Sequence, residues 1–129
     1  MIWRAATLAA LSLAAATSAA AADFQPPLAE QARLVNQRFA DSAAAVAEGY
    51  LAIPCRDAMR YVNATYLKDE VPSLGRPQAL LYELGGDGRL ELVAVEYRYG
   101  RAPFNDLLVW IGEREPTSDA LICRARYFE

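Results

Sequence analysis

The 129-residue sequence contains no histidine, one lysine and only two cysteines. Without histidine, the chain cannot carry Ser-His-Asp or Cys-His catalysis, a histidine-rich zinc or copper site, or an imidazole-based pH switch. Any acid-base chemistry would depend on carboxylates, tyrosines, arginines or Lys68. Few classes of enzyme remain, and we expect neither a metal nor a cofactor.

Long apolar runs are scarce outside the N-terminus. Arg4 precedes an Ala/Leu-rich run over residues 5–16, and small residues at 20–22 precede Asp23. This is the layout of a secretory signal peptide, and the run is short and alanine-rich for a membrane span. We predict a signal peptide at 1–22 and a single domain at 23–129, either periplasmic or secreted; an uncleaved membrane anchor is the alternative.

Positive charge is also in short supply. Thirteen Lys and Arg residues stand against sixteen Asp and Glu residues, a net charge of −3. Removing Arg4 with the leader leaves twelve basic residues against sixteen acidic ones, a net charge of −4. Nucleic acids and anionic membranes bind basic surfaces. We therefore expect neither as a partner of the mature chain.

The two cysteines, Cys55 and Cys123, would meet an oxidising compartment after export. We predict that they form a disulfide, which would close a loop of nearly seventy residues and contribute about 4 kcal/mol in the chain-entropy model. A metal-binding pair and a free reactive thiol are the alternatives, but two cysteines without histidine make a poor ligand set.

The first structural segment of the mature chain has the apolar period of a helix. We predict one long helix that begins after Pro27 and ends at Gly49. Its apolar stripe consists of Leu28, Ala32, Val35, Phe39, Ala43, Val46 and Tyr50.

After this helix the pattern favours strands. We predict a loop over residues 51–57 and then about five antiparallel strands, at 60–66, 78–84, 90–99, 106–112 and 120–128. The consecutive apolar residues of the fourth segment indicate a central strand. The predicted fold class is α+β, with one long N-terminal helix packed on an antiparallel sheet and one disulfide.

The strongest local signal is a hairpin across Gly86-Asp87-Gly88, with Gly88 in the left-handed conformation. The resulting register places three pairs under the helix: Leu84 with Leu90, Tyr82 with Leu92, and Leu80 with Ala94. The opposite face of the hairpin is also partly apolar. This indicates either a strongly curved sheet or a second buried surface, such as a homodimer contact.

Three segments resemble a family of small exported bacterial proteins of unknown function: Arg60-Tyr61-Val62-Asn63, residues 76–83 and residues 92–97. The resemblance covers about half of the mature chain, and Cys55, Trp110 and Cys123 also match the family plan. It implies an exported, disulfide-bearing domain and supplies no activity. Arg60 stands where the family has histidine, so no role of that histidine transfers.

Four residues are candidates for a binding site: Arg60, Tyr61, Asn63 and Glu96. Arg60 could hold a carboxylate or phosphate, and Glu96 could bind a polar ligand or act as a base if burial raised its pKa. The alternatives are an ion pair of Glu96 with Arg60 or Arg98, and tyrosines that serve as half-buried packing. No residue is predicted to be catalytic.

Two functional hypotheses follow from these patterns. The first is a non-enzymatic module that binds a small molecule or a protein, and the lack of a catalytic set favours it. The second is a small or degenerate enzyme with a cavity between helix and sheet, in which Glu96 and Arg60 would act on a small organic acid.

Overall fold

The computed structural model describes residues 26–101, 103, 105–113, 117, 120 and 123. The predicted signal peptide at 1–22 and the predicted start of the domain at residue 23 lie outside these residues. Within the described part of the chain, no helix combines the length and the apolar character that a membrane crossing requires.

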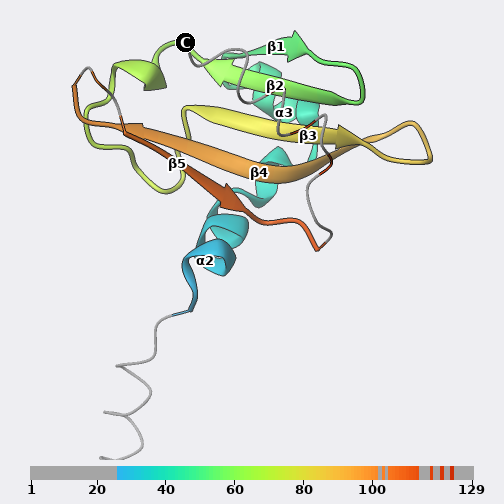
Figure 1. Ribbon diagram of the computed structural model, residues 1–129, viewed down its shortest axis with the longest axis horizontal. Helices are drawn as coiled ribbons and strands as arrows, with labels where there is room; N and C mark the ends of the chain where they lie inside the picture. The colour runs from blue at the N-terminus through green and yellow to red at the C-terminus, as the bar shows by residue number, and fades with distance from the viewer. Residues whose placement is uncertain are drawn as a thin grey trace, which may run out of the picture.

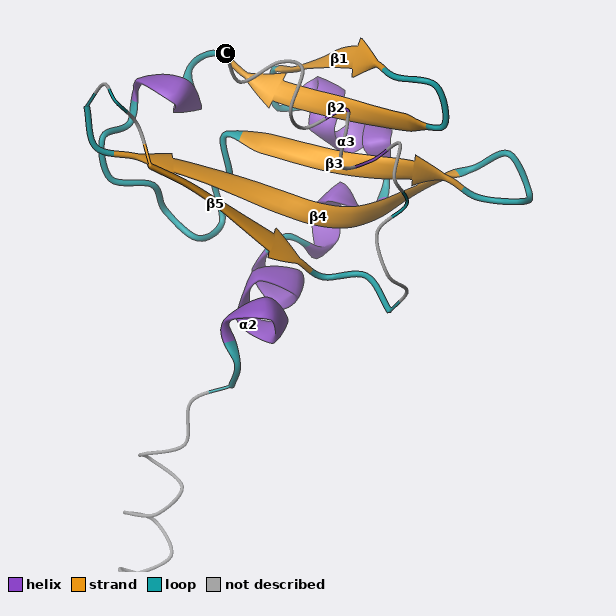
Figure 2. Ribbon diagram, in the orientation of Figure 1, coloured by secondary structure: helices purple, strands orange, loops and turns teal. Residues whose placement is uncertain are grey.

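The centre of the fold is an antiparallel sheet in which each strand pairs with the next along the chain (Figures 1 and 2). This confirms the predicted five-stranded antiparallel sheet. The strands are β1 (Tyr50–Pro54), β2 (Ala58–Asn63), β3 (Ala79–Leu84), β4 (Leu90–Tyr99) and β5 (Asn105–Trp110).

Short helices replace the single long helix that the apolar period predicts. They are α2 (Leu28–Val35), the 3₁₀ helix η1 (Gln37–Ala40) and α3 (Ser42–Ala47), with a further 3₁₀ turn, η2 (Tyr66–Lys68), after β2. The prediction of one continuous helix is therefore wrong. The breaks fall at Asn36, whose side chain donates to the carbonyl of Ala32, and at Asp41, whose carboxylate caps α3. Such short polar side chains compete with helical hydrogen bonds.

The breaks change which side chains reach the sheet. Ala32, Phe39 and Tyr50 of the predicted stripe are buried, but Val35 and Val46 are 45% and 58% exposed. A single helical phase cannot hold through two interruptions, because each one rotates the following segment about its axis. Gly49 ends the helical region with a φ of 100°, as expected for a glycine terminator.

The strand predictions hold for the middle of the chain and fail at both ends. Residues 51–57, predicted as a loop, contain most of β1, which pairs with β2 from Tyr50 opposite Asn63 to Pro54 opposite Met59. The predicted last strand at 120–128 is wrong where it is described, because Ala120 and Cys123 are helical. The rest of that segment lies outside the described residues.

The apolar run predicted as a central strand instead forms β5, an edge strand of the described sheet. Its first residues are exposed, including Leu107 at 41%, whereas Val109 is buried in the core shared with the helices. Consecutive apolar residues are equally compatible with an edge strand that a helix packs against, as α2 does in Figure 1.

The β3–β4 hairpin has the predicted turn, with Gly88 at a φ of 79°. Leu84 lies opposite Leu90 and Tyr82 opposite Leu92, as predicted. The register then shifts by one residue, so that Leu81 rather than Leu80 lies opposite Ala94. This is the geometry of a β-bulge, in which one strand carries an extra residue. Beyond the bulge, every side chain of β4 is on the face opposite to the predicted one.

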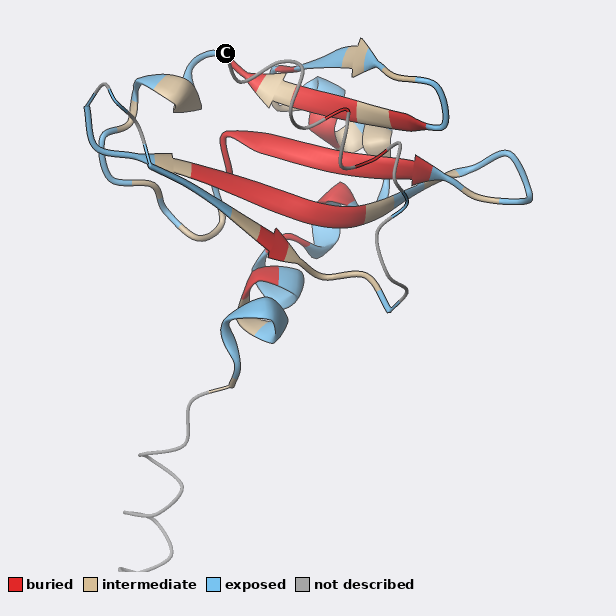
Figure 3. Ribbon diagram, viewed as in Figure 1, coloured by how far each residue is buried: buried red, intermediate tan, exposed pale blue. Residues whose placement is uncertain are grey.

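Both faces of the sheet are buried, and the central strands carry most of the buried residues (Figure 3). The helix face contains a core that is rich in tyrosine. On the other face, Ala58, Leu81 and Ala94 pack with Ala120 and Cys123 of the same chain. The second apolar face of the hairpin is therefore covered by the protein itself, which explains it without a dimer.

The predicted disulfide is confirmed. Cys55, just after β1, is bonded to Cys123, and the two Cα atoms lie 5.7 Å apart. The bond joins residues 68 positions apart in the chain and holds Cys123 against the sheet face opposite α2, η1 and α3.

Candidate functional site

Two of the four residues predicted to bind a ligand meet in the folded protein. Nη2 of Arg60 lies 3.0 Å from Oε2 of Glu96, and their side chains are only 1% and 2% exposed. In the strand register, Leu81 of β3 lies opposite Arg60 of β2, and Ala79 of β3 lies opposite Glu96 of β4. The pair therefore reaches across the central strand, from β2 to β4.

This ion pair lies on the face away from the helices. Met59 and Tyr61, the neighbours of Arg60, are in the helix-side core, as are Val95 and Tyr97, the neighbours of Glu96. The predicted hairpin register places Glu96 on the helix face, in line with Leu90, Leu92 and Ala94, and this prediction is wrong because the β-bulge reverses the faces beyond it. The enzyme hypothesis requires Glu96 to line a cavity between helices and sheet. Glu96 does not, because its side chain is on the other face of the sheet.

Burial dominates the electrostatics of Arg60. Desolvation lowers the pKa of its guanidinium below the ordinary value, and the carboxylate of Glu96 offsets part of this effect. A pair removed from solvent in this way cannot meet a diffusing ligand unless the covering residues move. The ion pair that was the structural alternative for Glu96 is the arrangement observed.

Tyr61 and Asn63 have structural contacts on the helix side. The Tyr61 ring packs edge-to-face on Tyr82 with the ring centroids 4.9 Å apart. The Asn63 side chain donates to the carbonyl of Glu48 and accepts from the backbone N–H groups of Thr65 and Tyr66, which ends β2. The four predicted residues thus divide between the two faces of the sheet and form no common surface.

A surface groove lies elsewhere, between α2 and η1 on one side and the start of β4 and the end of β5 on the other. It consists of two adjoining hollows that share Arg33 and Ile111. The inner hollow has a volume of about 430 Å³ and is lined by Arg33, Asn36, Gln37, Ala40, Leu90, Glu91, Leu92 and Ile111. The outer hollow has a volume of about 250 Å³ and is lined by Ala29, Glu30, Arg33, Trp110, Ile111 and Gly112. We call the two together the α2 groove.

The α2 groove combines an aliphatic floor with polar walls. Leu90, Leu92 and Ile111 are half-buried side chains next to the helix-side core. The helical wall carries Asn36, which is buried, and Gln37, which is exposed. Pockets that bind small molecules have this composition, mostly apolar with a few polar groups that set orientation.

Asn36 connects the groove to the loop before β3. Its amide nitrogen donates to the carbonyls of Ala32 and Leu74, at 2.8 and 3.1 Å, and lies 3.3 Å from the Tyr97 hydroxyl. Its side-chain oxygen is buried and accepts no hydrogen bond from a described residue. Asn36 therefore keeps acceptor capacity next to the inner hollow.

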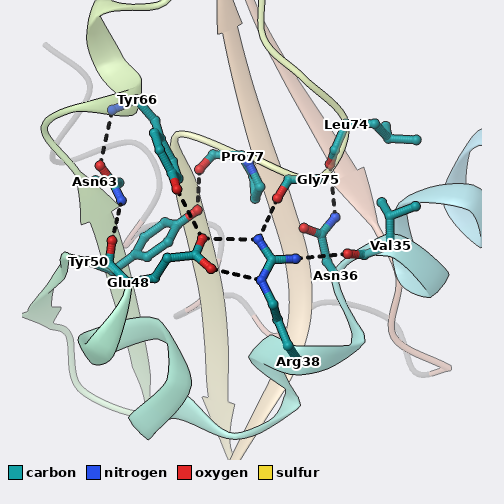
Figure 4. Close-up of polar contacts among 10 residues, drawn as sticks. All are labelled: Val35, Asn36, Arg38, Glu48, Tyr50, Asn63, Tyr66, Leu74, Gly75 and Pro77. Atoms are coloured by element: carbon teal, nitrogen blue, oxygen red, sulfur yellow. Dashed lines mark hydrogen bonds and ion pairs between the residues drawn. The ribbon is translucent and has the colours of Figure 1, made fainter.

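A polar network behind Asn36 holds this wall in place (Figure 4). Arg38 binds Glu48 through two hydrogen bonds of 2.9 and 3.0 Å and also donates to the carbonyls of Val35 and Gly75. The Tyr66 hydroxyl donates to the same carboxylate. These bonds fasten the junction of α2 and η1 to the loop around Gly75.

The charges of this network stabilise one another. The hydrogen bond from Arg38 lowers the pKa of Glu48, and the same bond raises the pKa of Arg38. Both side chains are partly exposed, so the pair itself contributes little free energy. Its effect is positional, because a two-pronged arginine contact has a defined geometry.

Comparisons of the chain with protein-family models, with curated proteins and with solved structures find no match. The resemblance to exported bacterial proteins therefore stays a prediction, and any function has to be argued from the geometry.

The sequence patterns did not indicate the α2 groove. Arg33 lies outside the apolar stripe of the predicted long helix, and Trp110 lies in the segment at 106–112 that was predicted as a central strand. The groove exists because the chain breaks at Asn36 and because β5 lies at the sheet edge, and neither feature has a periodic signal. The one available clue is Asn36 itself, a helix-disfavouring residue in the middle of an apolar period.

Proposed function

We propose that this protein is an exported ligand-binding domain and that its ligand occupies the α2 groove. The observation that carries the proposal is the inner hollow of about 430 Å³, whose aliphatic floor faces polar groups on a helix. This volume is within the range of small-molecule sites, roughly 300–1,000 Å³. Export is supported by the disulfide, because such bonds persist in oxidising compartments.

Binding is favoured over catalysis by the chemistry of the lining. The described residues that line the two hollows include no Ser, Thr, Cys, Tyr or Lys, which are the usual side-chain nucleophiles besides carboxylates. Metal chemistry has no support either, since the described residues contain no cluster of three or more His, Cys, Asp or Glu side chains suited to a metal ion.

A small molecule is a better candidate than a second copy of the chain. The apolar sheet face that suggested a homodimer is covered by Ala120 and Cys123. The α2 groove is concave and bounded on both sides, which suits an occupant a few carbon atoms wide.

Fluorescence of Trp110 provides a direct test. The chain has two tryptophans, and Trp3 is in the predicted leader, so Trp110 would be the sole tryptophan of a protein spanning residues 23–129. The probe is N-phenyl-1-naphthylamine, an uncharged apolar fluorophore, added to the oxidised protein. We expect saturable energy transfer from Trp110, which lines the outer hollow.

A matched pair of variants localises the binding. Ala40 lines the inner hollow and is exposed, so Ala40→Phe should fill the hollow and weaken probe binding at least tenfold. Ala43 is also exposed but does not line the groove, so Ala43→Phe should bind as the unmodified protein does. If the probe fails to bind, or if both variants bind equally well, the proposal is wrong.

A further inference from the structure

Among the described residues, Arg33 is the cation of the α2 groove and the one charged residue that lines both hollows. Its charged partner among the described residues is Glu30, one helical turn earlier, with Nη2 3.6 Å from Oε1. This distance exceeds the 2.7–3.2 Å of a normal hydrogen bond of this kind. The two side chains are 51% and 53% exposed.

Arg33 differs in this respect from the other arginines that pair with a carboxylate in the described part of the chain. Arg38, Arg60, Arg98 and Arg101 each approach their partner within 3.0 Å. Arg38 also bonds to two backbone carbonyls. Among these five arginines, Arg33 is thus the one whose donors are least engaged with its carboxylate partner, and a guanidinium carries five N–H donors in a planar fork.

Replacing the Glu30 contact costs little free energy. An exposed pair three residues apart on a helix contributes little to stability, because water screens both charges. An anion in the groove, by contrast, can accept two parallel hydrogen bonds from the guanidinium in a site partly shielded from water. The exchange therefore favours a ligand anion over Glu30.

The rest of the lining defines what is attached to this anion. The aliphatic surface of the groove consists of Leu90, Leu92 and Ile111. It adjoins Arg33, because Arg33 and Ile111 both line the two hollows. Glu91 alternates with Leu90 and Leu92 along β4, so its carboxylate is on the opposite face of the sheet from this aliphatic surface. A negative group is therefore favoured at the Arg33 end of the groove.

We infer that the ligand is an anionic amphiphile, with one carboxylate or similar head group held by Arg33 and an aliphatic body lying on Leu90, Leu92 and Ile111. This inference rests on the proposed function, because it assigns the ligand class of the same groove. Arg33 determines the preference for head-group charge, and the aliphatic floor supplies affinity that is independent of charge.

The test is displacement of the bound naphthylamine probe from the oxidised protein by three compounds with the same ten-carbon chain: decanoate, decanol and decylamine. We expect decanoate to displace the probe at about a tenfold lower concentration than decanol, which corresponds to one charge-assisted contact. Decylamine should be the weakest of the three.

Variants of Arg33 separate the charge preference from binding itself. Arg33→Gln should remove the advantage of decanoate, and Arg33→Glu should reverse it in favour of decylamine. The readout is the ratio of the decanoate and decanol concentrations that displace the probe from one and the same variant, because a change in probe affinity affects both concentrations equally. Arg56 is exposed and outside the groove lining, so Arg56→Gln is the matched control and should keep the decanoate preference.

The outcomes distinguish the two proposals. If the probe binds and Ala40→Phe blocks it, but decanoate and decanol compete equally or decylamine competes best, the groove binds ligands and the assigned class is wrong. If the decanoate preference survives Arg33→Gln, the role of Arg33 is wrong. If the probe does not bind at all, both proposals fail together.

Discussion

The two faces of the sheet bury polar groups by different means. On the helix face, the hydroxyls of Tyr50, Tyr82 and Tyr97 donate to the backbone carbonyls of Pro77, Phe39 and Leu74. On the other face, Arg60 and Glu96 form an ion pair, and the Cys55–Cys123 disulfide holds Cys123 against the neighbouring apolar residues. One face therefore uses neutral hydrogen bonds, and the other combines buried charge with a covalent bond.

The two sheet faces differ because different segments of the chain pack on them. The short helix η1, which contains Phe39, and the loop before β3, which contains Leu74 and Pro77, leave carbonyl groups that tyrosines reach from the strands beneath. The cover of the other face includes residues far along the chain, and a covalent link reduces the entropy lost when such a segment is ordered. Three perturbations test this account, in decreasing order of expected effect.

The largest effect should come from loss of the disulfide. Cys55→Ala with Cys123→Ala removes a link between residues 68 positions apart. We expect the free energy of unfolding to fall by about 4 kcal/mol in the chain-entropy model, measured by urea denaturation. Reduction of the unmodified protein should reproduce the loss, and an oxidised protein no more stable than the double variant would contradict the prediction.

The second effect concerns the buried ion pair. Glu96→Leu or Arg60→Met alone should cost about 3 kcal/mol, because each leaves a charge in a desolvated site without its partner in the pair. The double variant should be less destabilised than the sum of the singles by well over 1 kcal/mol. Urea denaturation of all three proteins gives this coupling energy.

The Arg98–Asp106 pair is the matched control for that cycle. Its two side chains are 18% and 25% exposed and their charged atoms are 2.9 Å apart, so its coupling should be below about 1 kcal/mol. Equal coupling for the two pairs would mean that burial does not distinguish them, and the two sheet faces would not differ in the way they bury polar groups.

The third effect belongs to the helix face and appears at alkaline pH. Burial raises the pKa values of Tyr50, Tyr82 and Tyr97 above the ordinary 10.0. In the unfolded chain these phenols lose their protons near pH 10, while the folded protein retains them, so folding stability falls as pH rises above 10. We expect a loss of about 1 kcal/mol from each of Tyr50 and Tyr82 by pH 11, and a further loss in the same direction from Tyr97, seen as a lower urea midpoint.

Tyr82→Phe sharpens this prediction. At pH 8 the variant should lose about 1 kcal/mol, because the Phe39 carbonyl loses its donor. Between pH 10 and 11 its stability should fall less steeply than that of the unmodified protein, since one titrating group is absent. If stability falls equally steeply with pH in the two proteins, the proposed difference in Tyr82 pKa between the folded and unfolded states is wrong.

Local chemistry was a reliable guide where neighbouring residues decide the conformation. The β3–β4 turn follows from Gly88, and the end of the helical region follows from Gly49. The disulfide was predictable because the chain contains only two cysteines. The ion pair between Arg60 and Glu96 was one of the predicted alternatives, but the sheet face on which it lies was not predicted.

The failures occur where distant contacts outweigh local preference. Asn36 breaks the helix with help from the carbonyl of Leu74, 38 residues away. The bulge in β4 places Glu96 on the disulfide side, and no local turn residue signals it. The α2 groove depends on both the helix break and the edge position of β5. The sequence therefore offers no indication that its lining residues lie together.

By itself, the sequence determined the antiparallel hairpin, the α+β composition of the chain and the cysteine pairing, because these depend on turn chemistry, apolar period and composition. Only the tertiary structure decided where the helix breaks, which face receives the buried ion pair and where a groove opens. The physical reason is that a single long-range hydrogen bond or one extra strand residue changes the direction of every side chain that follows, at a free-energy cost too small to leave a pattern in the sequence.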